Sequence, residues 1–393
     1  MAENNEKEYE SVLDELEAEF KALREETHRQ QRRLTGLVGR LRDLRPSMKT
    51  RITKEVKRQI LQEQIDTIFP KDNLYDVQKR LWLTPNQAKS KPPFIPVTER
   101  PIGLRGVSTR FVSIINFKGG VGKTTITANI GAAFATGQYN LPNKVKGVPL
   151  NVLFVDLDFQ GTLTDRCVPT PSLNTNITGA AELFNYPPKI KLSKLLMPVV
   201  ALDNAKIIPS VDILDAKDSE AFMRLACGLL DTRFFFRRWF HNSDVLSQFD
   251  LVLFDCPPRF TASTMCALTT SDFAFIPTTP DLFDQAPIVR TSSFINRLCR
   301  TLKTPCQIGG IILNRTAKEG ALTAKEKNFI ARINVPIDDN VDSLPFLKTH
   351  IPKRSGEKDS IVSDLGDPIP GGLPKRLPFI KDLASEIYAR IYQ

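Results

Sequence analysis

Hydrophobic positions follow a helical spacing in the first part of the chain and form short apolar runs in the rest. Between residues 11 and 45 they recur in steps of three and four, as the seam of a coiled coil requires. The seam positions are Leu13, Leu16, Phe20, Leu23, Thr27, Gln30, Leu34, Leu37, Leu41 and Leu44. We expect one long helix within residues 1–48, which either self-associates as a coiled coil, the reading we favour, or packs on its own domain.

Two shorter helices are expected in residues 49–84. Apolar positions share one face in residues 50–69 and again in residues 73–83, and a break at Pro70 separates the two segments. This layout is compatible with a helix-turn-helix, although most short helix pairs do not read DNA. Residues 85–107 are rich in proline and predict a linker or an extended strap before a domain over residues 108–393.

That last domain contains several apolar, β-branched runs separated by helical segments. The runs predict strands over residues 111–116, 151–158, 250–255, 273–277 and 309–314. Helices are expected over residues 125–136, 222–241 and 379–392. We take the aromatic stripe within residues 222–241 to face the core, the alternative being nucleic-acid stacking. Alternation of strands and helices predicts an α/β fold, a doubly wound and mostly parallel sheet with helices on both faces.

The first predicted strand runs into a glycine-rich loop and then into a helix, in the segment FVSIINFKGGVGKTT. Strand, loop and helix in this order form the phosphate cradle of P-loop proteins, because glycines let backbone N–H groups turn toward an anion. Lys123 is the candidate for the β- and γ-phosphates, and the Thr124 hydroxyl is a candidate Mg²⁺ ligand. The expected nucleotide-binding residues are Gly119, Gly120, Val121, Gly122, Lys123, Thr124 and Thr125.

One departure from the standard P-loop pattern points to a family. Phe117 stands where that pattern has glycine, and Lys118 follows it within the loop. The segment KGGVGKT resembles the deviant Walker A motif of the ParA/MinD ATPases. The resemblance implies ATP and Mg²⁺ as cofactors, and a homodimer in which Lys118 acts catalytically on the nucleotide held by the other subunit.

Three further segments resemble motifs of the same family. VDLDFQGTLT is similar to the family's DxDPQ switch segment, with Phe159 in place of proline. This similarity implies that Asp158 orients or deprotonates the attacking water and that Asp156 belongs to the Mg²⁺ shell. The two aspartates could also exchange these roles. DLVLFDCPP is similar to its Walker B strand, which implies that Asp255 holds Mg²⁺ through a water. In GIILNR, Asn314 corresponds to an asparagine that reads the adenine edge.

Composition narrows the choice of partners. The chain has 54 Lys and Arg against 44 Asp and Glu, a net charge of +10, which suggests a polyanionic partner without choosing among DNA, RNA and acidic lipid. Six cysteines without CxxC spacing and three separated histidines argue against disulfides and a His-based metal site. We find no signal peptide or membrane span, so a cytoplasmic protein is expected.

The resemblance also implies what the protein does. Basic patches follow Thr316, and in the family the C-terminal half supplies a DNA-binding face to the ATP-bound dimer. We therefore expect a DNA-segregation or cargo-positioning ATPase that binds DNA non-specifically, associates with the nucleoid in its ATP state, and has a DNA-bound adaptor that stimulates hydrolysis. We expect the last helix to dock on the domain rather than on a membrane. The alternative is a nucleotide-switched regulator or scaffold, in transcription control or phage defence, acting through its N-terminal coiled coil.

Overall fold

The computed structural model describes residues 94–392, except residues 104, 169–178, 186–189, 227–229, 242, 282–283, 319, 334–344 and 354–377. The helices expected in residues 1–48 and 49–84, and the first part of segment 85–107, lie outside the described residues. The described residues belong to the domain that follows them and to the end of the proline-rich segment.

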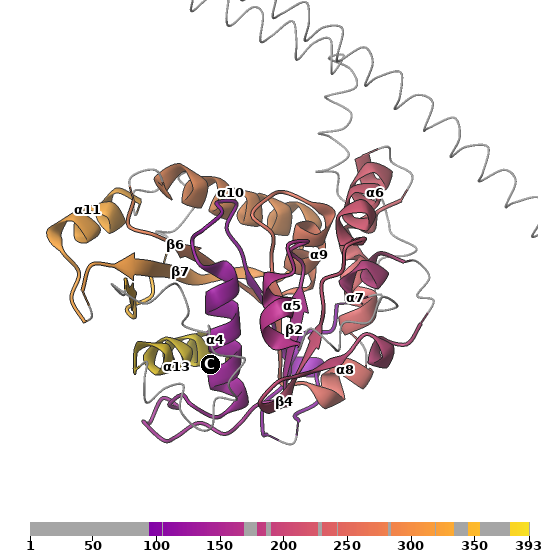
Figure 1. Cartoon of the computed structure of the whole chain (residues 1–393), viewed down its shortest axis with the longest axis horizontal. Helices are drawn as coiled ribbons and strands as arrows, with labels where there is room; N and C mark the ends of the chain where they lie inside the picture. The colour runs from indigo at the N-terminus through magenta and orange to yellow at the C-terminus, as the bar shows by residue number, and fades with distance from the viewer. Residues whose placement is uncertain are drawn as a thin grey trace, which may run out of the picture. The chain divides into compact units, whose positions relative to one another are not determined.

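Eight strands form a single sheet in the order β3-β4-β2-β5-β1-β6-β7-β8. Figure 1 shows β6 and β7 side by side in this sheet. They are β1 (Arg110–Ile114), β2 (Val152–Asp156), β3 (Met197–Val199), β4 (Leu202–Ile208), β5 (Leu251–Asp255), β6 (Phe273–Thr278), β7 (Gln307–Thr316) and β8 (Ile351–Pro352). Neighbouring strands are parallel, apart from the antiparallel pair β3 and β4. The predicted doubly wound, mostly parallel sheet is confirmed.

Helices cover both faces of this sheet, because successive strand residues point to opposite sides. On β1, for example, Phe111 belongs to one hydrophobic core and Val112 to the other. One face is covered by α4 (Lys123–Ala135), α5 (Thr162–Cys167) and α13 (Pro378–Tyr392). The other is covered by α6 (Leu214–Ala226), α7 (Phe235–Phe240), α8 (Ser243–Gln248), α9 (Ala262–Thr270), α10 (Gln285–Leu302) and α11 (Ala324–Ile333).

The helix after the glycine-rich loop lies unusually close to the sheet. A Cβ placed on Gly131 of α4 would come within 2.2 Å of the Phe154 ring on β2, so only glycine fits there. This close approach fixes the N-terminus of α4 relative to the ends of the central strands, which is where the candidate site lies.

The segment predicted as one helix over residues 222–241 is divided. Helix α6 ends at Ala226. A separate 3₁₀-helix, η5 (Thr232–Phe234), begins at Thr232 and continues directly into α7. The Asp231 side chain accepts a hydrogen bond from the Arg233 backbone N–H and so caps η5. The prediction of one continuous helix was wrong, whereas the core-facing aromatic stripe is confirmed, since Phe236 and Phe240 are fully buried.

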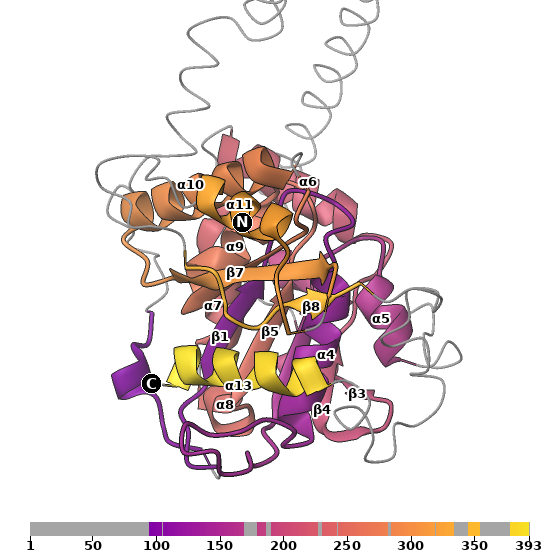
Figure 2. The same ribbon diagram turned by 90° about the vertical axis from the view of Figure 1, so that its left-hand side faces the viewer.

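The C-terminal helix docks on the domain, as expected. Helix α13 packs beside α4 (Figure 2) and buries Ile380, Leu383 and Ile387. The Tyr388 ring stacks on Tyr139 with centroids 4.8 Å apart. Within the described part of the chain, no helix combines the length and apolarity needed to cross a membrane.

Residues 94–109 run along the domain and are fastened to it by a buried arginine. The Arg100 guanidinium forms two hydrogen bonds with the Asp272 carboxylate, at 2.6 and 2.8 Å, and lies 4.9 Å from the centroid of the Phe111 ring. Nearby, the Ile95 N–H donates to His241 Nδ1 at 3.1 Å. The second half of the proline-rich segment is therefore a packed strap, linked to the start of β1.

Replacing Arg100 by leucine should destabilise the domain strongly, because it leaves the buried Asp272 carboxylate without its cation. Breaking such a pair costs about 3–5 kcal/mol. The matched control is Arg224→Leu, which removes an exposed i,i+4 pair with Glu220 and should cost no more than about 0.5 kcal/mol. Urea unfolding followed by circular dichroism measures both, and equal small losses would contradict the anchoring role of Arg100.

Candidate nucleotide-binding site

The glycine-rich loop joins β1 to α4 and is held by a buried asparagine. Asn116 is fully buried; its Nδ2 donates to the Pro277 carbonyl on β6 at 2.8 Å, and its Oδ1 accepts from the Lys118 N–H at 2.9 Å. Gly120 and Gly122 have φ angles of 74° and 92°, which L side chains rarely adopt. The loop conformation thus depends on the contacts of Asn116 and on glycine at these two positions.

Asn314, expected to contact the adenine base, lies at the end of β7 against this loop. Its Nδ2 donates to the Val121 carbonyl at 2.9 Å, and a Cβ on Gly122 would come within 2.3 Å of the same nitrogen. The side chain is 8% exposed and lines the cavity in front of the loop. Asn314 is therefore in the site, where its described contact is with the loop; the base contact stays a prediction.

Lys123 begins α4 and points back over the loop. Its side chain is buried, and Nζ donates to the Lys118 carbonyl at 2.9 Å. Burial lowers the pKa of Lys123, while the nearby carboxylates of Asp255 and Asp158 oppose that shift. An ammonium at the N-terminus of a helix, beside inward-turned N–H groups, is suited to binding a phosphate.

Lys118 forms an ion pair within its own chain. Its Nζ contacts the carboxylate of Asp284, the fully buried residue that precedes α10. Asp284 also accepts a hydrogen bond from the Thr279 N–H at 3.1 Å, so this carboxylate is held in place. About one third of the Lys118 side chain is exposed, and it is absent from the cavity lining.

Two carboxylates lie side by side at the ends of neighbouring strands. The register pairs Asp156 of β2 with Asp255 of β5, and both are almost completely buried. Burial, and for Asp156 the charge of Asp255, raises the pKa of both groups above the usual aspartate range. Thr124 and Lys123 act in the opposite direction on Asp255, since they stabilise its ionised form.

The two carboxylates differ in how well their oxygens are satisfied. Asp156 Oδ2 accepts from the Thr164 N–H at 2.8 Å and from the Thr164 hydroxyl at 2.7 Å, and its Oδ1 accepts from the Asp158 N–H at 3.2 Å. Asp255 Oδ2 is buried and has no hydrogen-bond partner among the described residues. An orphaned carboxylate oxygen near Thr124 fits Mg²⁺, whereas Asp156 is already occupied in holding the segment after β2.

In the part of the chain that the structure describes, no cluster of three or more His, Cys, Asp or Glu side chains could hold a metal. A Mg²⁺ at Thr124 and Asp255 would consequently need oxygen ligands from outside the protein. Phosphates and waters are the usual source, because Mg²⁺ commonly binds one or two protein oxygens plus substrate phosphates. The residues present therefore suit a magnesium–nucleotide complex better than a bare metal ion.

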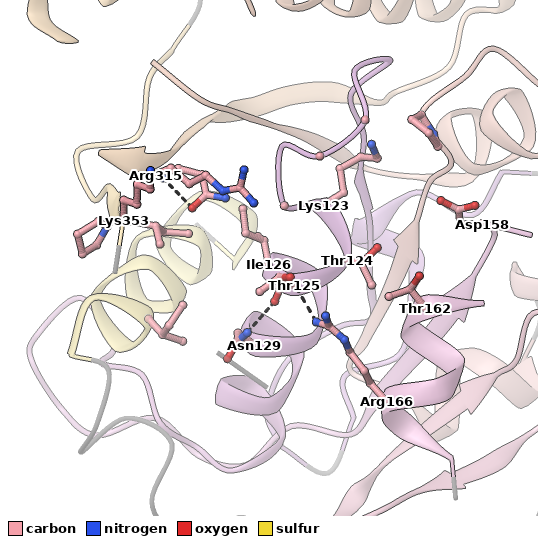
Figure 3. A pocket seen from close by; sticks show the side chains of 18 residues that line it. Lys123, Thr124, Thr125, Ile126, Asn129, Asp158, Thr162, Arg166, Arg315 and Lys353 are labelled. Carbon is pink, nitrogen blue, oxygen red and sulfur yellow. Dashed lines mark hydrogen bonds between the residues drawn. The ribbon is translucent and has the colours of Figure 1, made fainter. Parts of the chain in front are cut away.

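A cavity of about 560 Å³ opens in front of the loop, a size suited to a small ligand (Figure 3). Its lining includes Lys123, Thr124, Thr125, Asp158 and Asn314. It also includes three cations that were not predicted to belong to the nucleotide site, Arg166, Arg315 and Lys353, the last of which lies in the basic stretch after Thr316. Four cationic side chains against the one carboxylate of Asp158 make the lining strongly positive. Such a cavity favours a polyanionic ligand.

Phenylalanines at the two positions that depart from the family pattern are explained in part by packing. Phe117 contacts Phe294 of α10 with ring centroids 5.2 Å apart, and Phe294 contacts Phe260, in the loop after β5, at 4.8 Å. Phe159 is 41% exposed and lies under the Arg259 guanidinium, 4.7 Å from its ring centroid. Aromatic contacts thus connect the start of the glycine-rich loop to the loop after β5.

A family model described as an AAA domain matches residues 109–308, about half of the 393-residue chain. This span contains the loop, both buried carboxylates and Asp158. The chain belongs to the ParA/MinD-type ATPases.

Known relatives share this core at low identity. An uncharacterised protein of Mycobacterium tuberculosis is 26% identical over 241 residues, 61% of this chain and 68% of that protein. The chromosome partitioning protein ParA of Caulobacter vibrioides is 25% identical over 224 residues, 54% of this chain and 72% of ParA. A solved structure, an ATP complex of McdA from Cyanothece, is 18% identical with a TM-score of 0.57 and covers 72% of this chain and 98% of McdA; this likeness concerns the fold.

For this ParA/MinD-type ATPase we expect Asp156→Asn to weaken the pH dependence of stability. The pKa of Asp156 and of Asp255 is higher in the folded protein than in the unfolded chain, so ionising these groups favours the unfolded chain. The free energy of unfolding therefore falls as the pH rises from about 4, the pKa of an aspartate in the unfolded chain, through the higher pKa values of the folded protein. The wild type should lose on the order of 2 kcal/mol more than Asp156→Asn between pH 5 and pH 8.

Urea unfolding without nucleotide or Mg²⁺ measures this difference, since a bound cation would offset the repulsion. Asp203→Asn, at an exposed position on β4, is the matched control and should follow the wild type. Equal pH slopes in all three proteins would contradict the electrostatic account of the carboxylate pair.

Proposed function

We propose that this protein binds ATP with Mg²⁺, dimerises around two nucleotides, binds DNA non-specifically as that dimer, and hydrolyses ATP to drive DNA segregation or cargo positioning. The observation that carries the proposal is the cation-lined cavity in front of a deviant P-loop, in a chain of the ParA/MinD type. In this proposal, residues of the loop and of the strand ends bind and hydrolyse the nucleotide, and two surface helices bind DNA.

The nucleotide phosphates bind along residues 119–125. The loop N–H groups and the start of α4 hold the phosphate oxygens, and Lys123 contacts the β- and γ-phosphates. The Thr124 hydroxyl and the free oxygen of Asp255, directly or through a water, hold Mg²⁺, which when bound neutralises charge on the phosphates. Asn314, which lies against the loop, meets the adenine, which would require it to exchange its contact with Val121.

Hydrolysis is an in-line attack of water on the γ-phosphorus, in which the bond to the bridging oxygen of ADP breaks. Asp158 lines the cavity and carries the carboxylate that orients the water, consistent with its place after the carboxyl end of β2. Asp156 supports this group by accepting its backbone N–H. Lys123 stabilises the negative charge of the transition state, and catalysis is mainly positioning and charge neutralisation.

Dimerisation would change the partner of Lys118. In a single chain the ammonium is neutralised by Asp284. In the proposed dimer it leaves Asp284 and reaches the nucleotide of the other subunit, where it adds a positive charge at the γ-phosphate. The site is then complete only when two nucleotide-bound subunits meet, which ties hydrolysis to assembly.

Helices α10 and α11 support the DNA-binding part of the proposal. They pack against each other and carry six exposed cationic side chains, Arg290, Arg297, Arg300, Lys325, Lys327 and Arg332. Their one acidic residue, Glu326, is buried and accepts hydrogen bonds from the N–H groups of Ala317 and Thr323. A helix pair whose own exposed charges are all cationic is suited to phosphate contacts that carry no sequence preference.

The remaining parts of the proposal concern partners and location. A DNA-bound adaptor protein would stimulate hydrolysis and release the dimer from DNA, and the protein would be cytoplasmic, on the nucleoid in its ATP state. The alternative, a nucleotide-switched regulator acting through its N-terminal helix, needs the same nucleotide site but no DNA binding. DNA binding therefore separates the two functions.

We expect binding to random-sequence DNA with ATP, and little or none with ADP or without nucleotide. Lys123→Ala should abolish it, because the nucleotide is no longer held by its phosphates. Replacing both Lys325 and Lys327 by glutamate should weaken ATP-dependent binding and lower the salt slope by roughly one for each phosphate that the protein no longer neutralises, while Lys194→Glu, at an exposed lysine elsewhere, serves as the matched control. Fluorescence anisotropy across a salt series measures all four proteins.

Two outcomes would contradict the proposal. Absence of DNA binding in every nucleotide state, with nucleotide binding intact, would leave the ATPase core and move the function to the protein-docking switch. Equal DNA affinity with and without ATP would show that DNA binding by the cationic surface does not depend on the bound nucleotide.

A further inference from the structure

An arginine outside every motif of the sequence analysis enters the nucleotide cavity. Arg166 lies on α5, in the segment after β2, and its side chain lines the cavity (Figure 3). Its Nη1 donates to the Thr125 hydroxyl at 3.3 Å, a long hydrogen bond. Among the described residues it has no ion pair, so most of its five N–H donors are available to a ligand.

A second, independent feature lies one helical turn further along α4. Asn129 is 1% exposed and lines the same cavity. Its Nδ2 donates to the Thr125 carbonyl at 2.7 Å, but its Oδ1 has no partner among the described residues. A buried acceptor without a donor costs free energy, which a ligand hydroxyl or a bound water would recover. Arg166 and Asn129 thus offer unused donors and an unused acceptor on either side of Thr125.

The order of residues along the loop and helix tells which part of a nucleotide would meet them. Lys123 serves the β- and γ-phosphates and Thr124 the Mg²⁺ between them. Thr125 is the next residue of α4, one position beyond the Mg²⁺ ligand, so we assign the phosphate beside it as the one attached to the ribose. At 3.3 Å from the Thr125 hydroxyl, the Arg166 guanidinium lies next to this position.

We propose that Arg166 is a nucleotide-binding residue that contacts the α-phosphate, with Asn129 accepting a hydrogen bond from the adjoining ribose or its water. This assignment rests on the proposed function and deepens it. Because ADP and ATP share the α-phosphate, the contact contributes equally to the binding of both and leaves the hydrolysis step unchanged. It also connects the nucleotide to α5, whose Thr164 holds Asp156.

The test compares binding of ADP and of a non-hydrolysable ATP analogue, each with Mg²⁺, to the full chain by isothermal titration calorimetry. Arg166→Gln should weaken both ligands by the same factor, about tenfold or more, since a charge-assisted hydrogen bond is removed. Arg166→Lys keeps the charge but not the planar fork and should give an intermediate affinity. Arg224→Gln, an arginine on α6 outside the cavity lining, should bind as the wild type does.

Two further measurements distinguish a binding role from a purely structural role: steady-state ATP hydrolysis, and thermal unfolding in the absence of nucleotide. We expect Arg166→Gln to raise KM with kcat unchanged and to unfold at the wild-type temperature. Unchanged affinities, or a loss confined to the ATP analogue, would overturn the α-phosphate assignment while leaving the proposed function standing. No binding of either nucleotide by the wild type would overturn the proposed function and this assignment together.

Discussion

Two carboxylates buried side by side at the carboxyl edge of the sheet are the constraint on which the site depends. Parallel pairing of β2 with β5 puts Asp156 and Asp255 at the same level, where neither reaches water. Burial raises the pKa values of both, the charge of Asp255 adds to this for Asp156, and the charge of Asp158 adds to it for Asp255, so the ionised pair is unfavourable unless cations and donors surround it. Thr164 supplies donors to Asp156, and Lys123 and Thr124 face Asp255.

The two lysines of the glycine-rich loop also lie next to carboxylates. Lys123 is buried beside Asp255, and Lys118 is neutralised by Asp284, so both lysines of the loop have carboxylates near them in the single chain. Mg²⁺ at the free oxygen of Asp255 would add positive charge there, and the phosphates of a nucleotide would balance Lys123 and Arg166. In the proposed complex, a magnesium-bound nucleotide would therefore balance the cations that line the cavity.

Local patterns predicted the parts of the fold that depend on neighbouring residues in the chain. The central strands β1, β2, β5, β6 and β7 were predicted because buried parallel strands are continuous apolar runs, whereas the short edge strands β3 and β8 were not. The loop between β1 and α4 was predicted because its glycines have a backbone requirement visible in the sequence. The division of residues 222–241 was missed, since both pieces bury aromatic side chains and the interruption is set by a cap at Asp231. A periodic pattern does not record where such a helix stops.

Contacts between segments that are distant along the chain could not be predicted from the sequence. Arg100 meets Asp272 across 172 positions, and the strap it fastens has the composition of a linker. Arg166 enters the cavity because α5 turns back beside α4, and no motif marks it. The sequence placed Asn314 near the end of a strand, where the site lies. Its hydrogen bond to the Val121 carbonyl depends on how β7 packs against the loop and could not be predicted.

We propose that ATP transfers Lys118 from its own Asp284 to the nucleotide of a second subunit. Analytical ultracentrifugation of Asp158→Ala, in which hydrolysis should be blocked, tests it most directly when done with ATP and with ADP. We predict dimers with ATP, monomers with ADP, and monomers in both nucleotides when Lys118→Ala is added. Equal dimerisation with either nucleotide, or ATP dimers that persist without Lys118, would contradict the claim.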